Sequence, residues 1–133
     1  MAFVQGASSQ QPLRIMIVED NSKVRELIRC ALNGDENEII ECIDGADALE
    51  AYKVHRPDVV LMDIQMPRLD GLSATRILRE HDPDARVHIL SDYDEDELGW
   101  AATAAGACGF TSKVNIHELD SILSRYAIRR HRR

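Results

Sequence analysis

The stretch that most constrains the fold is residues 59–67, with the sequence VVLMDIQMP. Its first four residues are all apolar and do not alternate with polar ones, which is typical of a strand buried on both faces in a parallel sheet. The apolar run ends on a carboxylate, Asp63. Because ligands of open α/β sheets bind at the carboxyl ends of strands, we interpret Asp63 as a residue that takes part in chemistry rather than in packing. The simpler interpretation is an aspartate that caps a turn or a helix.

Four other short apolar runs alternate with longer segments of helical periodicity. The further strands are expected at residues 14–18, 38–43, 87–90 and 108–111, with two acids placing 38–43 at an edge. The helices are expected between Asn21 and Asn33, between Gly45 and Arg56, at about 71–79, at about 94–105, and through residues 116–126. Five strands alternating with five helices predict an α/β fold with a doubly wound parallel sheet. We expect the flavodoxin-like strand order 2-1-3-4-5.

Apolar side chains recur at helical spacing in these segments. Asp20 or Asn21 can cap the first helix, whose inner face we expect to consist of Val24, Leu27, Ile28 and Ala31. Asn33-Gly34 would end it. The last helix carries one stripe made of Ile116, Leu119, Ile122, Leu123 and Tyr126.

Charge and composition limit the classes of partner. The chain of 133 residues has a net charge of −7, but residues 125–133 carry five arginines and no acid. Residues 1–124 therefore hold 11 Lys and Arg against 23 Asp and Glu, a charge of −12, which argues against nucleic acid as a partner. No apolar run approaches the roughly 20 residues of a membrane span. Residues 1–12 also lack the basic and apolar regions of a secretory signal.

The length predicts one domain with a tail at each end. We expect a disordered N-terminal tail over residues 1–12, a folded domain over residues 13–128 and a basic C-terminal tail over residues 129–133. Three interpretations of the basic tail are open: it is solvated and frayed, it begins a linker, or it contacts an acidic partner. Cys30, Cys42 and Cys108 show no CxxC spacing, so we expect small buried thiols in a reducing cytosol.

The predicted strand order brings five polar side chains to one edge of the sheet. Its switch point lies between the first and third strands, which end at Glu19, Asp20 and Asp63. Ser91 and Lys113 arrive from the ends of the fourth and fifth strands. Three carboxylates in one cleft repel one another unless a cation lies among them, and oxygen ligands with room for water favour Mg²⁺. One carboxylate can then attack phosphorus, while Lys113 and the Ser91 hydroxyl stabilise phosphoryl oxygens.

Four motifs make residues 13–128 similar to the receiver domain of two-component response regulators. They are VED at 18–20, LMDIQMPRLDG at 61–71, HILS at 88–91 and GFTSK at 109–113. The resemblance implies a cytoplasmic signalling protein rather than an enzyme in the usual sense. A sensor histidine kinase or a histidine phosphotransfer protein would supply the phosphoryl group. The domain would catalyse only its own aspartyl phosphorylation and dephosphorylation.

The same resemblance implies roles for individual residues. Asp63 is the expected phosphoacceptor, and Lys113 is the expected phosphate-binding lysine. Glu19 and Asp20 match the acidic pair that holds Mg²⁺ together with Asp63, and the Gln65 main-chain carbonyl is a further expected ligand.

Two residues match the switch of the family. Ser91 corresponds to its hydroxyl switch, and Phe110 corresponds to its aromatic rotamer switch. In the family, phosphorylation shifts the population toward a conformation with a remodelled face of the fourth helix, fifth strand and fifth helix. A homodimer or an effector is expected to bind through that face.

The chain departs from the family pattern beside the expected site. Val114 stands where a proline joined by a cis bond usually follows the lysine, and a cis bond without proline costs about 2.5–4 kcal/mol. Asp92 replaces a small residue after the switch hydroxyl. Two interpretations are open: its carboxylate points toward the site, or it turns to solvent or caps the next helix. Gln65, Asp92 and Tyr93 are therefore candidates for tuning the rates, and Phe110 offers no phenol to bond outside.

One aromatic residue stands out on the predicted fourth helix. The inward stripe is made of Leu98, Ala101, Ala102 and Ala105, which leaves Trp100 off it. Trp100 is then either exposed as part of a partner face or partly buried like an ordinary aliphatic residue.

Two other functions use the same fold elements. Haloacid-dehalogenase-type phosphatases also carry a strand-end aspartate nucleophile with Mg²⁺, but they place a second acid two residues later, where this chain has Gln65. The other alternative is a binding module that is never phosphorylated, since a fold does not fix function. Whether the receiver stands alone or was part of a longer regulator is left open by the sequence.

Overall fold

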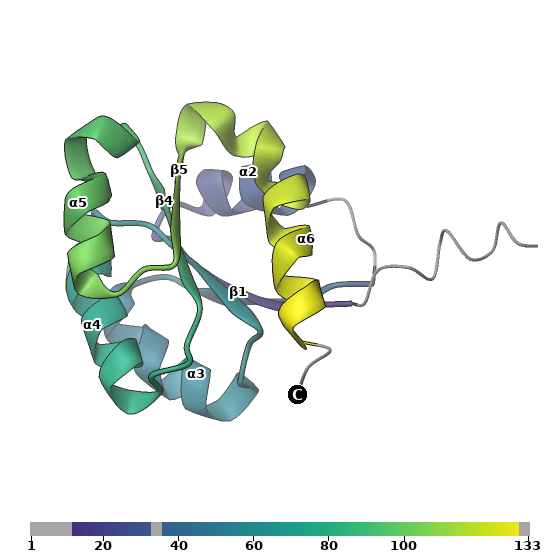
Figure 1. The fold of residues 1–133 in the computed structure, drawn as a ribbon, viewed down its shortest axis with the longest axis horizontal. Helices are drawn as coiled ribbons and strands as arrows, with labels where there is room; N and C mark the ends of the chain where they lie inside the picture. Colours follow the sequence, from purple (N-terminus) through teal and green to yellow (C-terminus); the bar gives the residue numbers. More distant parts are fainter. Residues whose placement is uncertain (1–11, 33–35, 131–133) are drawn as a thin grey trace, which may run out of the picture.

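One parallel sheet of five strands forms the centre of the protein (Figure 1). The computed structural model describes residues 12–32 and 36–130. The strands lie in the order β2-β1-β3-β4-β5, which confirms the predicted order and places β2 at an edge. Their bounds are β1 Arg14–Val18, β2 Glu38–Cys42, β3 Val59–Met62, β4 Val87–Ser91 and β5 Gly109–Ser112.

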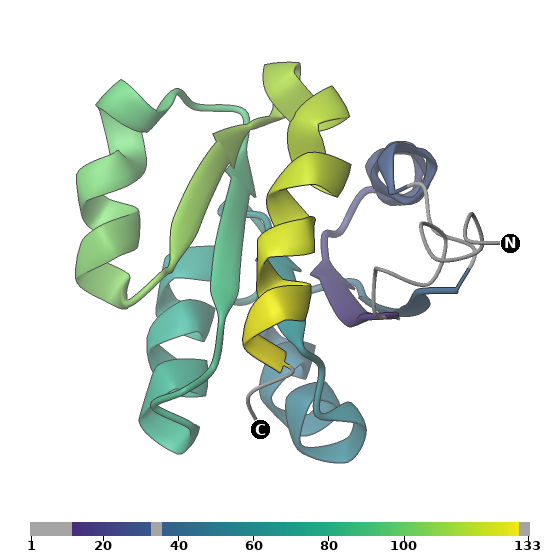
Figure 2. The ribbon, with the colours of Figure 1, turned by 45° about the vertical axis from the view of Figure 1, so that its right-hand side comes forward.

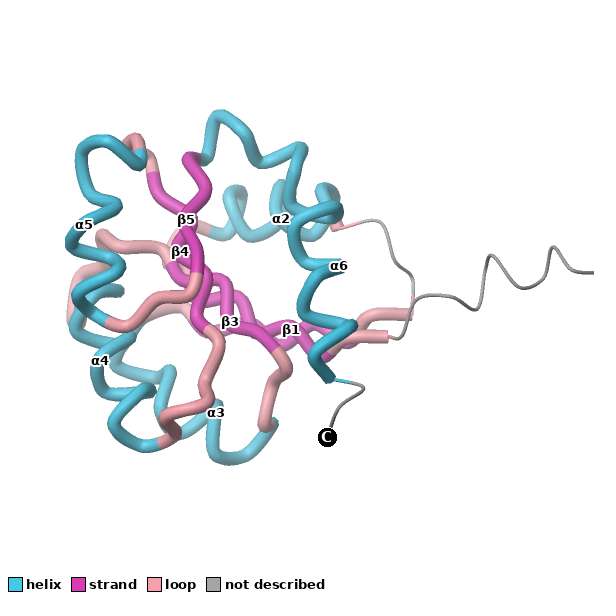
Figure 3. Tube along the Cα trace, in the orientation of Figure 1, coloured by secondary structure: helices cyan, strands magenta, loops and turns pink. Residues whose placement is uncertain are grey.

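Helices cover both faces of this sheet (Figures 1 and 2). The α-helices are α2 Ser22–Ala31, α3 Ala48–His55, α4 Gly71–His81, α5 Glu95–Ala105 and α6 Leu119–Arg130. Short 3₁₀ segments precede two of them, η1 Gly45–Asp47 and η2 Lys113–Glu118. Helices α3, α4 and α5 lie on one side of the strands, and α2 and α6 lie on the other (Figure 3). Within the described ranges, no helix is long and apolar enough to cross a membrane.

Alternate residues of the central strands feed two separate cores. In β1, Met16 and Val18 pack toward α3, α4 and α5, whereas Ile15 and Ile17 pack toward α2 and α6. Each of these four side chains is fully buried, as the unbroken apolar run requires. The two cores therefore fix the register of the strands, and with it the positions of the residues that follow them.

Three of the sequence predictions about burial are wrong. Leu27 is 59% exposed, because it lies at the margin of the stripe that α2 presents through Ile28. Cys30 and Cys108 are exposed thiols, and only Cys42 is buried. Cys30 lies six residues after Val24, which places it on the outer side of the helix.

Several predictions concern positions outside the described residues. These are the Asn33-Gly34 helix stop and most of the two tails, at residues 1–11 and 131–133. Helix α6 continues through Arg130, two residues into the segment predicted to be a basic tail.

Helix α5 carries its apolar residues on one side, as predicted. Ala101, Ala102 and Ala105 are buried against the sheet, and Trp100 is 73% exposed. Asp94 is the N-cap residue of the helix, and the Glu97 carboxylate accepts from its N–H at 2.8 Å. The exposed interpretation of Trp100 is therefore confirmed.

Candidate phosphoacceptor site

The ends of β1 and β3 bring the predicted acidic residues together. Val18 and Met62 are paired in register, so the residues after them, Glu19 and Asp63, leave neighbouring strands at the same level. The N–H of Asp63 donates to the Val18 carbonyl at 3.0 Å, and this bond extends the ladder up to Asp63. Glu19 and Asp63 are buried, and Asp20 is exposed.

The cap of α2 leaves Asp20 available for binding. Asn21, and not Asp20, caps the helix, since its Oδ1 accepts from the N–H of Lys23 at 2.9 Å and from that of Val24 at 3.2 Å. The N–H of Asn21 donates to Glu19 Oε2 at 3.1 Å and orients that carboxylate. The capping requirement of the helix is thus met without the Asp20 side chain.

The ends of β4 and β5 supply a hydroxyl and a cation. Ser91 pairs in register with Ser112, and Lys113 follows directly. The Lys113 ammonium donates to Glu19 Oε1 at 3.0 Å and lies 3.2 Å from Asp63 Oδ1. The buried Ser91 hydroxyl accepts from the N–H of Tyr93 at 3.0 Å, which leaves its proton free to donate elsewhere.

The three acids form a group that fits a hard cation. One carboxylate oxygen from each of Glu19, Asp20 and Asp63 lies within 4.8 Å of the others. Three negative charges outnumber the single ammonium of Lys113, so the cleft is short of positive charge. Since one of the carboxylates is exposed, water can complete a coordination shell. An all-oxygen set with access to water suits Mg²⁺.

Burial shapes the protonation of the site. Desolvation raises the pKa of Asp63, an effect that the Lys113 charge partly offsets. Desolvation also raises the pKa of Glu19, against the hydrogen bond from Lys113, and the charge of Asp63 adds to the rise. Burial alone would lower the pKa of Lys113, but its hydrogen bond to Glu19 and the charge of Asp63 raise it. Lys113 is therefore kept in its charged form between two carboxylates. Burial disfavours the ionised form of both carboxylates.

The sequence matches the family described as response regulator receiver domain over residues 15–124. This chain belongs to that family. Membership supports the receiver interpretation over the dehalogenase-type phosphatase, and it agrees with a signalling protein rather than a conventional enzyme.

Two relatives illustrate the similarity. The probable transcriptional regulatory protein NarL of Mycobacterium tuberculosis is 37% identical over 110 residues, which cover 80% of this chain and 51% of NarL. The chain thus spans about half the length of this curated relative. The solved signal receiver domain of that NarL has a TM-score of 0.75 at 32% identity, covering 86% of this chain and 98% of the solved one. A CheX–CheY–BeF₃–Mg²⁺ complex from Borrelia burgdorferi matches with a TM-score of 0.75 at 26% identity, covering 86% and 90%.

Two side chains of the receiver meet at the mouth of the cleft. Gln65 Nε2 donates to the Tyr93 hydroxyl oxygen at 3.2 Å, and both residues are exposed. This bond joins the loop after β3, which begins at Asp63, to the loop after β4.

The Asp92 side chain shows features of both predicted orientations, toward the site and toward solvent. Its side chain is 72% exposed, yet its Oδ2 lies 3.9 Å from the Lys113 ammonium. Its charge also contributes to the raised pKa of Asp63, after the larger effects of desolvation and Lys113. Asp94 caps α5 instead, so capping gives no account of Asp92.

The remaining predicted residues lie beside the cleft. Phe110 pairs with Ile89 across β4 and β5 and packs, half-buried, against the core under α5. Val114 is 76% exposed, and the described residues contain no cis peptide bond, so the bond between Lys113 and Val114 is trans.

Sequence reasoning missed two residues that shape the loop between β3 and α4, which begins at Asp63. Gly71 lies against the main chain of Asp63, where an added Cβ would lie 1.8 Å from the Asp63 carbonyl oxygen. Asp44 is buried after β2 and accepts from the N–H groups of Arg68 and Leu69. The Asp-Gly pairs at 44–45 and 70–71 were the available signal, but such a pair is typical of any turn and does not indicate a long-range contact.

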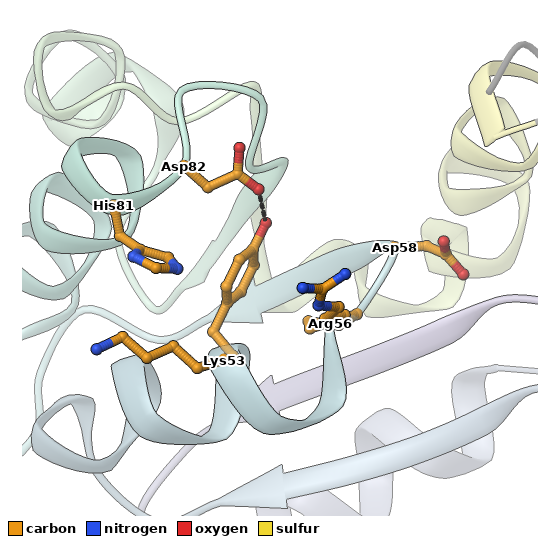
Figure 4. Close-up of a pocket in the computed structure, with 7 residues that line it drawn as sticks. Lys53, Arg56, Asp58, His81 and Asp82 are labelled. Carbon is orange, nitrogen blue, oxygen red and sulfur yellow. Dashed lines mark hydrogen bonds between the residues drawn. The ribbon is translucent and has the colours of Figure 1, made fainter.

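A groove in the described part of the chain lies away from this cleft (Figure 4). Its volume is about 660 Å³, and it lies beside the ends of α3 and α4, close to where β3 begins. It is lined by Tyr52, Lys53, Arg56, Pro57, Asp58, His81 and Asp82. The Tyr52 hydroxyl donates to Asp82 across it at 2.7 Å. None of the predicted site residues lines this groove.

Proposed function

We propose that this receiver accepts a phosphoryl group on Asp63 from a sensor histidine kinase or a histidine phosphotransfer protein, in a reaction that requires Mg²⁺. The observation that carries the proposal is the convergence of Glu19, Asp20, Asp63 and Lys113 in one cleft. Glu19, Asp20 and Asp63 would hold the ion, with the Gln65 carbonyl as a further ligand. When bound, Mg²⁺ neutralises charge on the incoming phosphoryl oxygens.

The chain's own residues account for the rest of the transfer. An oxygen of ionised Asp63 attacks phosphorus, the P–N bond of the phosphohistidine breaks, and the histidine leaves with the bonding electron pair and takes up a proton. Lys113 moves from Asp63 Oδ1 to a phosphoryl oxygen, and the Ser91 hydroxyl donates to another. Hydrolysis of the resulting acyl phosphate returns Asp63 and inorganic phosphate.

The proposal extends to the response and to the setting of the protein. Ser91 and Phe110 would couple the phosphoryl group to the face formed by α5, β5 and α6, where a second copy or an effector binds. Trp100, exposed on α5, would lie on that face. We further propose a receiver over residues 13–128 with tails on either side, in the cytoplasm.

Treatment with acetyl phosphate and Mg²⁺, followed by mass spectrometry, tests the acceptor. The parent should gain one phosphoryl group, and the Asp63→Asn variant should gain none. Asp84→Asn, an equal charge change in the loop after α4, should be modified like the parent. Full modification of Asp63→Asn, or a parent that stays unmodified with and without Mg²⁺, would overturn the proposal.

A further inference from the structure

Asp44 is a buried carboxylate that accepts three main-chain hydrogen bonds. It follows β2 and is only 3% exposed. Its Oδ1 accepts from the N–H of Ala46 at 2.9 Å and from that of Leu69 at 3.0 Å, and its Oδ2 accepts from the N–H of Arg68 at 3.0 Å. These bonds lower the pKa of Asp44 despite the opposing effect of burial. The group is thus an anion held by N–H donors.

Two of these bonds serve a distant loop. The bond from Ala46 caps η1 and is local, but Arg68 and Leu69 lie 24 and 25 residues away. They belong to the loop that connects β3 to α4, which begins at Asp63 and contains Gln65. A residue that only capped the 3₁₀ turn would need none of these long-range partners.

The packing around Asp44 holds the same loop closely. An added Cβ on Gly45 would lie 2.4 Å from the Leu69 carbonyl oxygen, so the turn after β2 lies directly against the loop. The Arg68 guanidinium donates to Asp47 Oδ2 at 2.7 Å, which adds a second connection. At the far end, the N–H of Gly71 donates to the Ile64 carbonyl at 2.7 Å. The segment from Gln65 to Pro67 is therefore held at both ends.

We propose that Asp44 is a positioning residue of the phosphoacceptor site. Its carboxylate fixes Arg68 and Leu69, and so fixes the main chain at Gln65 beside Asp63, where a divalent cation would be bound. Asp44 does not touch the cation or the phosphoryl group. The inference rests on the proposed function, since it assigns the Gln65 carbonyl to the metal. Groups that orient metal ligands typically change metal affinity by 10- to 100-fold when they are lost.

Three variants separate positioning from simple stability. Asp44→Ala removes all three acceptors. Asp44→Asn can keep the bonds from Ala46 and Leu69 but faces the N–H of Arg68 with an amide donor. Asp70→Ala is the matched control, because Asp70 caps α4 through Ser73 at the end of the same loop and bonds only within its own turn. All three lose or weaken a cap, but only the Asp44 variants remove hydrogen bonds between this loop and the turn after β2.

The first measurement is Mg²⁺ titration by calorimetry on the full chain. We expect the Kd to rise about tenfold in Asp44→Ala, to rise two- to fivefold in Asp44→Asn, and to stay within twofold of the parent in Asp70→Ala. If Asp44→Ala does not fold, Asp44→Asn decides. A Kd within twofold of the parent in every folded Asp44 variant would overturn the inference, as would an equal rise in Asp70→Ala.

The second measurement needs no metal. Amide hydrogen exchange and amide chemical shifts are compared in the metal-free proteins, and faster exchange at Arg68 and Leu69 with a shifted Gln65 amide is expected in the Asp44 variants alone. Unchanged signals at these positions would refute the positioning role. A parent that binds no Mg²⁺ would instead refute the proposed function, and the exchange data would still decide whether Asp44 holds the loop.

Discussion

The Lys113 ammonium nitrogen lies 3.2 Å from Oδ1 of Asp63. The Asp63 carboxylate is the group expected to attack phosphorus. A second bond, at 3.0 Å to Glu19 Oε1, places the same ammonium against an expected metal ligand. In the metal-free protein, Lys113 is thus the main counter-charge of the acidic cleft. A divalent cation that binds in the cleft is repelled by this ammonium, and we expect the ammonium to move when a phosphoryl group is transferred to Asp63.

Replacing Lys113 should therefore change metal binding and phosphorylation in opposite directions. Lys113→Gln removes repulsion between the ammonium and Mg²⁺, so we expect several-fold tighter Mg²⁺ binding. Phosphorylation by acetyl phosphate should slow on the order of a hundredfold, because a charged donor to the transition state is lost. Calorimetry and mass spectrometry measure the two effects. Lys53→Gln on the exposed surface of α3 is the control, and weaker Mg²⁺ binding in Lys113→Gln would contradict this account.

The hydrogen bond between Gln65 and Tyr93 should lengthen the lifetime of the phosphorylated form. The two side chains, joined at 3.2 Å, connect the loop after β3 to the loop after β4. We expect this pair to shield phosphorylated Asp63 from attack by water. Tyr93→Ala removes both ring and acceptor and should shorten the lifetime several-fold, while Tyr93→Phe keeps the ring and should have a smaller effect. Decay of the modified mass after donor removal measures both. An unchanged lifetime in Tyr93→Ala would show that the pair shields nothing.

The strand order and the acidic cleft could be predicted because short apolar runs end directly in the functional residues. Asp63 follows Val59–Met62, and Lys113 follows β5, so an ordered parallel sheet brings them together whatever the loops do. The position of Trp100 off the inward stripe was also readable, because alanines define the buried side of α5, but its degree of exposure was left open between two alternatives. Periodicity carries this information since it reports which side chains face the core.

The role of Asp44 could not be read in the same way. Its partners are the N–H groups of Arg68 and Leu69, which every residue except proline offers, so no side-chain pattern marks them. Leu27 shows a second limit. It fits the helical stripe by spacing, but α2 covers the sheet through a narrower contact centred on Ile28. Spacing gives direction, whereas burial depends on how closely the helix lies against its neighbours.

A buried histidine predicts a loss of stability in mild acid. His88 is 3% exposed, with ring nitrogens 2.7 Å from Thr111 Oγ1 and 3.3 Å from the Tyr126 hydroxyl. Burial, with the nearby charge of Arg125, lowers the pKa of His88 from 6.5 to about 4. The unfolded chain therefore binds this proton more readily. Stability should be complete above about pH 6.5 and fall by about 3 kcal/mol as the pH drops toward 4.

Urea unfolding at several pH values measures this loss. Carboxylates also titrate in the range, so the contribution of His88 is the difference in slope between the parent and His88→Gln, which should be flatter from pH 6.5 to 4.5. His117→Gln is the matched control, because the His117 side chain is 72% exposed and its slope should follow the parent. Equal slopes in all three proteins would rule out His88 as the cause.

Trp100 should report on the face formed by α5, β5 and α6. It is the only tryptophan and is 73% exposed, so beryllofluoride with Mg²⁺ should change its fluorescence if this face is remodelled. Trp100→Ala should alter the free energy of unfolding by no more than about 0.5 kcal/mol while weakening self-association or partner binding. Fluorescence that ignores beryllofluoride, together with unchanged association in Trp100→Ala, would remove Trp100 from the proposed face.

Asp92 should slow phosphorylation by small anionic donors. Its Oδ2 lies 3.9 Å from the Lys113 ammonium, so it competes for the cation that the phosphoryl group needs and adds negative charge at the mouth of the cleft. At 4 Å two unit charges interact by about 1 kcal/mol in water, which corresponds to roughly a fivefold change in rate. Because the side chain is 72% exposed, salt should screen the effect.

The deciding comparison is the rate of acetyl-phosphate modification at fixed Mg²⁺. Asp92→Ala should react several-fold faster than the parent at low ionic strength, and the ratio should shrink in about 0.5 M salt, where screening is strong. Asp96→Ala makes the same change of net charge in the exposed first turn of α5 and should leave the rate within twofold. If Asp92→Ala matches the parent at both salt concentrations, the contact with Lys113 does not reach the chemistry. If Asp96→Ala accelerates equally, net charge alone explains the rate, because of these two acids it is Asp92 that lies beside the Lys113 ammonium.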